Sequence, residues 1–223
     1  MRRVGWYLSS AWLILAVGCA GLSGDRSGHL PVPARACCKA GDTVVRQRAV
    51  ARTAASLVGV RTVEVNGRRI AYDCAGVTRA IYLKHGIDLY ENTDQSQQAN
   101  GVRLIYRHVR RHGRIHHGPV VRAGDLVFFD NTWDYNGDGV VNDPLTHVGV
   151  VEMVEADGTV VFISRVAGAV ERYRMNLAHP HVHRTDEGRI LNDYLRRKER
   201  RDTDGTPYLT GELFAAFGTR VES

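Results

Sequence analysis

The sequence predicts an α+β domain in which N-terminal helices pack on an antiparallel sheet. Up to about residue 112 the apolar residues recur at helical spacing, and after Pro119 they form short runs separated by turn residues. Helices that precede a group of strands favour the α+β arrangement over alternating α/β units. Residues 42–223 are expected to form one domain with its own core, and the sequence shows no internal repeat.

Residues 1–19 have the order of a secretory signal: two arginines, an apolar stretch from Trp6 to Val17, and then Gly18-Cys19. The stretch is shorter than the span of about 20 residues that crosses a bilayer. A buried N-terminal helix is the alternative to a signal. Ala16-Val17-Gly18-Cys19 resembles a bacterial lipobox, which implies lipidation of Cys19; ordinary cleavage after Ala20 is the alternative. We therefore expect an exported protein of the cell envelope that is anchored to a membrane by a lipid. Its expected location is the periplasm or the outer membrane.

Residues 20–41 are rich in Gly, Ser and Pro and lack apolar periodicity, so we expect a flexible tether. The formal net charge of +6 falls to +4 without Arg2 and Arg3, because residues 1–19 contain no acid. A mildly basic surface suits an anionic envelope polymer, although solubility alone explains it as well. The arginines are scattered and no binding motif accompanies them, which argues against a nucleic-acid partner.

Three helices and one hairpin are expected in the first half of the domain. Helical spacing of apolar residues covers Val44–Val58 and Cys74–His85, and each stretch is followed by a glycine that stops it. Thr62–Tyr72 is predicted to be a hairpin with Asn66-Gly67 as its two-residue turn. A further helix is expected over Asp94–His112.

Four strands are expected in the second half. They are Leu126–Phe129, Val148–Val154, Thr159–Ser164 and Ala169–Met175, with Asp157-Gly158 as the turn between the second and the third. The chain from Pro180 onward is polar and charged until Leu209–Phe214, which we expect to return to the core.

One of the four cysteines calls for a chemical explanation. Cys19 belongs to the signal, and the adjacent Cys37 and Cys38 are poorly placed to bridge each other. The three remaining cysteines cannot all pair within the chain, and Cys74 stands alone. An unpaired cysteine in an exported protein is either an inert buried residue or a reactive one.

The position of Cys74 favours a reactive thiol. Asp73-Cys74-Ala75-Gly76 lies where the hairpin ends and a helix begins. Unsatisfied N–H groups and the positive end of the helix dipole favour the thiolate there, so we expect a depressed pKa. The small residues that follow admit a substrate carbonyl, for which the Cys74 backbone N–H is a candidate oxyanion donor.

His147 is the candidate base for this thiol. It opens the strand His147-Val148-Gly149-Val150-Val151, where a ring can be held by the sheet and still reach a substrate. A cysteine and a histidine on separate elements are what a thiol hydrolase requires. Sequence order alone does not bring the two side chains together.

Three blocks resemble the NlpC-type cell-wall peptidases and the related CHAP amidases. They are Tyr72-Asp73-Cys74-Ala75-Gly76-Val77, Ala123-Gly124-Asp125-Leu126-Val127-Phe128-Phe129 and Thr146-His147-Val148-Gly149-Val150-Val151, and together they cover roughly residues 45–175. The resemblance implies a papain-like fold and cleavage of amide bonds in peptidoglycan stem peptides. It implies Cys74 as nucleophile and His147 as base, with no cofactor required. Asp73 is then a helix cap rather than a catalytic acid.

The family's third residue, which orients the histidine, falls on Ser164 when counted through the turn after the histidine strand. Serine accepts a hydrogen bond from imidazole but stabilises its charged form less than a carboxylate does. Two alternatives therefore stay open: an envelope protein of the same fold that binds the wall without turnover, and an acyltransferase that uses the same pair.

A metal site is predicted in the loop 134–143, where the pattern D-x-N-x-D-G opens a loop of the EF-hand kind. The candidate calcium ligands are Asp134, Asn136, Asp138, Val140, Asn142 and Asp143. The glutamate expected at position 12 is replaced by Leu145, and a plain Asx-rich turn is the alternative.

The remaining charged and histidine clusters are interpreted as solvated surface. His108, His112 and His116 recur at helical spacing, and His179, His181 and His183 alternate as on a strand. They lack Cys or acidic partners at zinc-ligand spacing. The run Arg196–Arg201 is expected to be an exposed charged helix.

Overall fold

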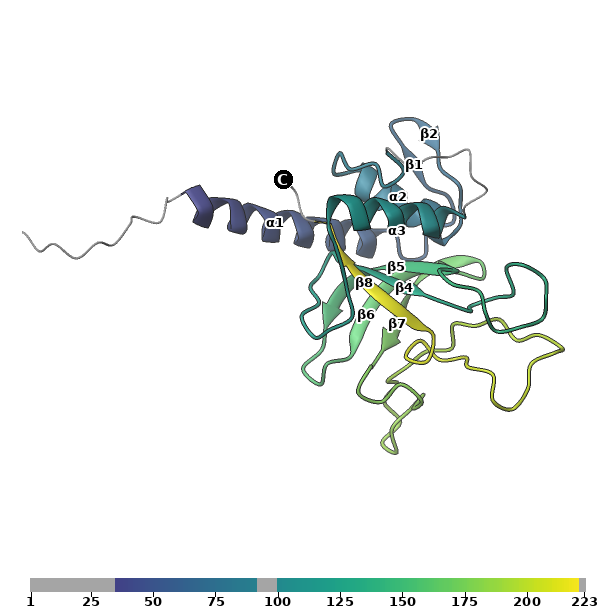
Figure 1. The fold of residues 1–223 in the computed structure, drawn as a ribbon. Helices are drawn as coiled ribbons and strands as arrows, with labels where there is room; N and C mark the ends of the chain where they lie inside the picture. Colours follow the sequence, from purple (N-terminus) through teal and green to yellow (C-terminus); the bar gives the residue numbers. More distant parts are fainter. Residues whose placement is uncertain (1–34, 92–99, 221–223) are drawn as a thin grey trace, which may run out of the picture. The chain divides into compact units, whose positions relative to one another are not determined.

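A six-stranded antiparallel sheet covered by three helices forms the domain, which confirms the α+β prediction. The computed structural model describes residues 35–91 and 100–220, all of which belong to one unit of the chain, residues 35–223. The signal expected at 1–19, including Cys19, and the first part of the tether lie outside the described residues. In Figure 1 the helices lie on one side of the sheet.

The helices are α1 (Arg35–Ser56), α2 (Cys74–Leu83) and α3 (Gly101–His112). Helix α1 begins before the predicted domain boundary, so residues 35–41 are helical where a flexible tether was expected. Ala, Arg and Lys in that stretch have high helix propensity. Helix α3 begins after Asn100, whose side chain accepts from the Arg103 N–H. Residues 94–99 of the predicted helix lie outside the described part of the chain.

The predicted hairpin consists of β1 (Glu64–Val65) and β2 (Arg68–Arg69). Asn66 and Gly67 connect them with φ angles of 51° and 73°. Both angles are positive, as a type I′ turn requires, and Asn-Gly is the preferred pair for such a turn. This hairpin leads directly into α2 and sets where Cys74 lies.

The large sheet has the order β3-β8-β4-β5-β6-β7, and its strands are β3 (Arg114–His116), β4 (Leu126–Phe129), β5 (His147–Val154), β6 (Val160–Val166), β7 (Ala169–Met175) and β8 (Phe214–Thr219). Strands β4 to β7 were predicted. Strands β3 and β8 were not, because β3 is short and basic and β8 contains Ala and Gly, which have low strand propensity.

Both faces of this sheet are buried. Leu126 and Phe128 of β4 pack with the helices, whereas Val127 and Phe129 pack on the opposite face. Successive strand residues point to opposite faces, so a run of four buried apolar residues needs cover on each side. The chain after β7 provides the second cover, with Leu195 and Leu213 in the same cluster. The predicted return of Leu209–Phe214 to the core is confirmed by the burial of Leu209 and Leu213.

Gly124 and Asp125 join α1 to the sheet. Asp125 is 1% exposed and accepts hydrogen bonds from the Gln47 side chain (3.0 Å) and the Arg122 N–H (2.8 Å). A Cβ on Gly124 would lie 2.2 Å from the Gln47 carbonyl oxygen, so only glycine allows this approach. The Gly-Asp pair before β4 therefore has a structural role.

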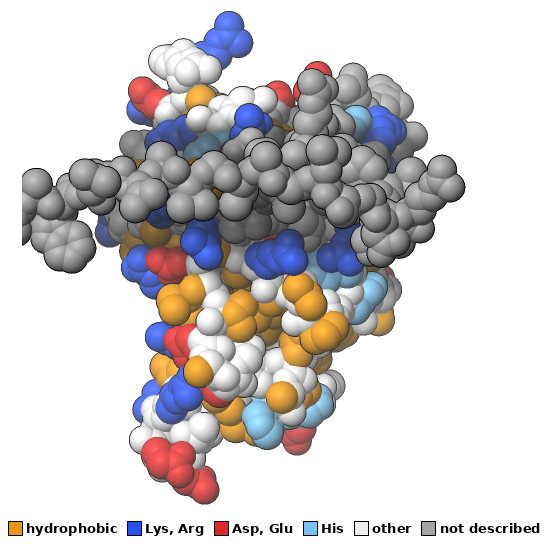
Figure 2. Space-filling model, turned by 90° about the vertical axis from the view of Figure 1, so that its left-hand side faces the viewer, with side chains coloured by type: hydrophobic (Ala, Val, Ile, Leu, Met, Phe, Trp, Pro, Cys, Tyr) orange, Lys and Arg blue, Asp and Glu red, His pale blue; other side chains and the backbone are white. Residues whose placement is uncertain are grey.

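The surface is mixed in character. On the face shown in Figure 2, basic side chains are interspersed with hydrophobic, acidic and histidine side chains among the residues that the structure describes. Within residues 35–91 and 100–220, none of the helices has the length and hydropathy that a membrane span needs.

The prediction for Arg196–Arg201 is wrong. This stretch is not helical, and Arg196 is only 8% exposed. Its guanidinium is held by an ion pair with Asp202 at 3.2 Å and by the Asn131 carbonyl oxygen. A buried ion pair within a loop overrides the charge pattern from which an exposed helix was inferred.

Candidate active site

Cys74 is the first residue of α2 and is half-buried. Asp73 precedes it in extended conformation and caps the helix by accepting from the Gly76 N–H at 2.7 Å. Gly76 packs so tightly that a Cβ there would lie 2.0 Å from the Ala71 carbonyl oxygen. The predicted capping role of Asp73 is confirmed, and the cap and the close packing together fix the direction in which the thiol leaves the helix.

His147 is the first residue of β5, is 8% exposed and pairs with Phe129 of β4. Its Nε2 atom lies 2.8 Å from the Ser164 hydroxyl oxygen. Ser164, on the neighbouring strand β6, is 1% exposed, and its hydroxyl also contacts the Val148 carbonyl oxygen at 2.7 Å. The structure thus brings Ser164 and His147 together, and their catalytic roles stay predictions.

These two contacts fix the tautomer of His147. A hydroxyl has one proton to donate, and a carbonyl oxygen can only accept. The Ser164 proton therefore goes to Val148, and the Ser164 oxygen accepts from the Nε2–H of His147. In the neutral ring this leaves Nδ1 with its lone pair free to act as a base.

Cys74 and His147 line one cavity of about 750 Å³. Its wall also includes Asn100 at the start of α3 and Trp133 in the loop after β4. Arg165, at the end of β6, and Arg196, in the segment after β7, also line the cavity. A cavity of this size fits a short peptide or a molecule of similar volume.

The resting pair is neutral, which corrects the expectation of a depressed thiol pKa. Burial, followed by the negative charge of Asp73, raises the pKa of Cys74 to about 11. Backbone N–H groups of Val148, Ala75 and Cys74 itself act in the opposite direction but are outweighed. Burial, followed by the positive charge of Arg165, lowers the pKa of His147 to about 4. The helix N-terminus therefore lowers the pKa of Cys74, as expected, but the loss of hydration on burial raises it by more.

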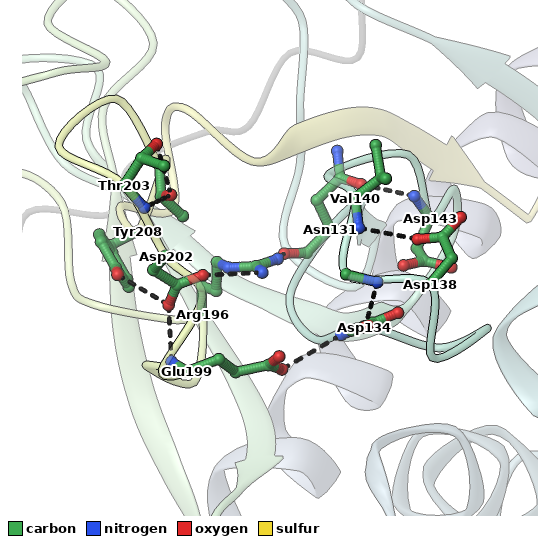
Figure 3. Close-up of polar contacts among 12 residues, drawn as sticks. Asn131, Asp134, Asp138, Val140, Asp143, Arg196, Glu199, Asp202, Thr203 and Tyr208 are labelled. Carbon is green, nitrogen blue, oxygen red and sulfur yellow. Dashed lines mark hydrogen bonds and ion pairs between the residues drawn. The ribbon is translucent and has the colours of Figure 1, made fainter.

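Residues 194–197 form part of the cavity wall, and the segment 194–202 to which they belong is fixed to the loop after β4. The Arg197 N–H donates to the Thr132 carbonyl oxygen, and Asp134 N–H donates to Glu199. Figure 3 shows the Arg196 side chain between Asp202 on one side and Asn131 on the other. Figure 1 shows the two segments side by side beyond the ends of the strands.

The loop 134–143 is folded around its own carboxylates. Asp134 accepts from the N–H groups of Gly137 and Gly139, both at 2.8 Å. The Asp138 carboxylate accepts from the side chains of Asn136 and Asn142 and from the Val140 N–H. Among the described residues no group of three His, Cys, Asp or Glu side chains is placed to hold a metal ion. Asx turns account for these contacts, and the calcium assignment remains a prediction.

Asp143, the last candidate ligand, is 3% exposed, and its backbone exchanges two hydrogen bonds with Asn131. These bonds close the base of the loop, a few residues before His147. The loop is therefore a fixed extension of the strand end that presents His147.

The interpretation of the histidines as solvated surface is wrong for His108. This residue is 3% exposed, because it shares the buried face of α3 with Ile105 and Val109. Its ring contacts the Glu91 carbonyl oxygen and the Arg220 side chain. His179 and His181 are exposed, as expected, whereas His112, His116 and His183 are half-buried.

Sequence reasoning did not single out Arg165 or Arg196 as site residues. Arg165 follows Ser164 directly, so its place beside the site is readable once Ser164 is chosen. Arg196 lies far along the chain in a run of like charges, and no local pattern distinguishes it from its neighbours.

A comparison of the chain with protein-family models, with curated proteins and with solved structures found no match.

Proposed function

We propose that this protein is a cysteine hydrolase of the bacterial cell envelope that cleaves amide bonds in peptidoglycan stem peptides. The observation that carries the proposal is the shared cavity of Cys74 and His147, with Ser164 holding the Nε2–H of His147. A thiol, a base with a free lone pair and a group that orients the base are the parts that acyl transfer from an amide needs. The resemblance to NlpC-type and CHAP enzymes, with its papain-like fold, supplies the substrate class.

The reaction begins from the neutral pair. As the Cys74 sulfur attacks the amide carbonyl, its proton moves to Nδ1 of His147, and the carbonyl oxygen turns toward N–H groups at the start of α2. His147 then gives this proton to the leaving nitrogen, so an amine departs and a thioester remains. Water attacks the thioester with His147 as base, which releases the carboxylic acid and restores the thiol.

Digestion of purified peptidoglycan tests the proposal. The protein without residues 1–19 should release peptides that mass spectrometry identifies by their new amino and carboxyl termini. Cys74→Ser and His147→Gln should abolish release while the circular dichroism spectrum stays unchanged, and the exposed His181→Gln serves as the matched control. If Cys74→Ser releases the same peptides at the same rate, the proposal is wrong. Products that carry an added amine instead of water would identify an acyltransferase.

A second function, binding without turnover, is favoured by one observation. The orienting residue Ser164 is uncharged, so it stabilises the imidazolium that forms during attack less than a carboxylate would. A binding protein retains affinity for stem peptides and releases no product. Calorimetric titration with a stem peptide, combined with the digestion, separates the two functions.

The envelope location is proposed from residues 1–19 alone. With Cys19 as the lipid-bearing residue, Cys19→Ala leaves the protein unprocessed or releases it in soluble form. A mature N-terminus at Gly21 would show ordinary cleavage after Ala20 instead.

A further inference from the structure

We infer that the cavity selects a peptide with a free carboxylate beside the amide that is cut, and that Arg165 binds this carboxylate. The inference rests on the proposed function and names the feature of the substrate that the site recognises. It makes Arg165 a specificity-determining residue.

Arg165 lies beside the reacting groups. It is the residue after Ser164 on β6, and it lines the same cavity as Cys74 and His147. Its guanidinium lies over the Tyr72 ring, 5.3 Å from the ring centroid. This cation–π contact holds the guanidinium at the cavity wall, and its two Nη groups, which have no hydrogen-bond partner among the described residues, remain to bind a carboxylate.

Arg165 lacks an acidic partner, as do the half-buried Arg103 and Arg107, but of these three arginines only Arg165 lines the cavity. Arg79 is paired with Asp88 at 2.7 Å, and Arg174 with Glu155 at 3.6 Å. Within residues 35–91 and 100–220, no carboxylate lies within 4.0 Å of Arg165. Its Nε atom is buried and has no hydrogen-bond partner. An arginine that is held at a cavity wall without a hydrogen-bond acceptor from its own chain favours the binding of an anionic ligand, which supplies the acceptor.

The charges of the residues that line the cavity also favour an anionic substrate. Its lining includes three arginines and one acid, a formal balance of 3 − 1 = +2. Arg196 is paired with Asp202, and the Asp73 carboxylate, whose charge acts on Cys74, accepts from the neutral Gly76 N–H. With Arg196 paired, Arg165 and the exposed Arg197 outweigh Asp73 by one positive charge, which favours anionic substrates.

A carboxylate fits this position better than other anions. The cavity contains a thiol and a base, which act on carbonyl carbon, so its substrate is an amide or ester. Stem peptides carry free carboxylates next to their amide bonds. A planar carboxylate also matches the guanidinium edge with two parallel hydrogen bonds.

Binding to an inactive protein tests the inference separately from catalysis. The probes are two synthetic stem peptides, identical except that the γ-linked glutamate carries a free α-carboxylate in one and a carboxamide in the other. In the Cys74→Ala background, calorimetry should give an affinity at least about tenfold higher for the carboxylate peptide, as expected for a charge-assisted bidentate pair. Adding Arg165→Met should remove this preference, and Arg165→Lys should retain part of it.

The control is Arg110→Met, which removes one exposed positive charge from α3 and should leave the preference intact. Equal affinities for the two peptides in the Cys74→Ala protein would overturn the inference, as would failure of both to bind at millimolar concentration. Equal weakening of both peptides by Arg165→Met would assign Arg165 a purely structural role. If the Cys74→Ala protein prefers the carboxylate peptide but the wild type hydrolyses neither peptide, the proposed function is refuted and Arg165 remains the carboxylate-binding residue of a protein that binds without turnover.

Discussion

The Ser164 hydroxyl holds His147 in one tautomer without adding charge to the site. In Ser164→Ala the Nε2–H of His147 loses its acceptor, so the ring proton can move to Nδ1. A protonated Nδ1 cannot act as the base that the reaction needs. We expect kcat to fall by about 10- to 100-fold with little change in KM, as for other groups that orient a ligand or base. The ¹⁵N shifts of the His147 ring should show Nε2–H in the wild type and a tautomer mixture in the variant. Unchanged ring shifts would contradict this account.

The raised pKa of Cys74 predicts a slow thiol. Only the thiolate reacts with iodoacetamide, and a pKa of about 11 leaves a very small thiolate fraction at pH 7. Labelling of Cys74, followed by mass spectrometry of its peptide, should be slower in the folded protein than in urea at pH 7. The folded rate should rise about tenfold per pH unit up to about pH 10. A rate that is already constant below pH 8 would show a preformed thiolate–imidazolium pair and contradict the prediction.

Most of the reacting groups could be predicted at the residue scale. Cys74 and His147 each lie in a short sequence block that resembles a known motif. The position of Ser164 is found by counting from the strand of His147 through the turn to the next strand. Arg165 and Arg196 depend on partners more than 60 residues away or on an absent partner, and no local pattern records either. The predicted direction of the Cys74 pKa shift was wrong, because the sequence around the start of a helix does not show how deeply the thiol is buried.

The segment 194–202, of which residues 194–197 line the cavity, is held in place by the buried Arg196. In Arg196→Met the contacts to the Asn131 carbonyl and to Asp202 are lost, so the segment should open more often. We expect trypsin to cleave after Lys198 several-fold faster than in the wild type. Arg200→Met, at an exposed position of the same segment, is the control. Equal cleavage rates in Arg196→Met and wild type would show that the ion pair does not hold the wall.

Calcium binding by the loop 134–143 is also testable at this scale. Binding would require Asn136 and Asn142 to turn their oxygens inward in place of the amide nitrogens that now face Asp138. Calorimetry with calcium should then give a Kd of about 10⁻⁴ to 10⁻³ M, the range of extracellular modules. Asp134→Ala/Asp138→Ala should abolish the heat, and Asp157→Ala, in the turn between β5 and β6, should not. Absence of heat in the wild type up to millimolar calcium leaves only the Asx turn.

Elements with strong local signals were predicted, and those that depend on distant pairing were not. The Asn66-Gly67 turn and the apolar run of β4 specify their own conformations. Strand β8 exists because β3 and β4 flank it, and its Phe-Ala-Ala-Phe-Gly-Thr sequence has little strand preference of its own. Its register with β4 is irregular between Phe128 and Phe129, a detail that only the assembled sheet defines.

For the whole molecule, burial of His147 makes stability depend on pH. Its pKa falls from 6.5 in the unfolded chain to about 4 in the fold, so between these values only the unfolded chain binds the proton. Stability is therefore lost as the pH falls from about 6.5 to 4, by up to about 3 kcal/mol from this residue.

Urea unfolding at pH 7, 5.5 and 4.5 measures this effect. His147→Gln should lose less stability than the wild type over this range, because it has no imidazole to protonate. The exposed His181→Gln should follow the wild type. Parallel curves for His147→Gln and wild type would contradict the assignment of the acid sensitivity to His147.

The place of β8 in the sheet has a consequence for how the protein is made. Strand β8 lies between β3 and β4, which precede it by roughly a hundred residues, as the pairing of Arg114 with Thr219 shows. A nascent chain that has reached only residue 210 therefore has an unpaired edge on β4 and leaves the three-residue strand β3 without a strand to pair with. The sheet is completed only after residues 214–219 have left the ribosome, and a protease that removes this strand also leaves β3 unpaired and exposes the edge of β4.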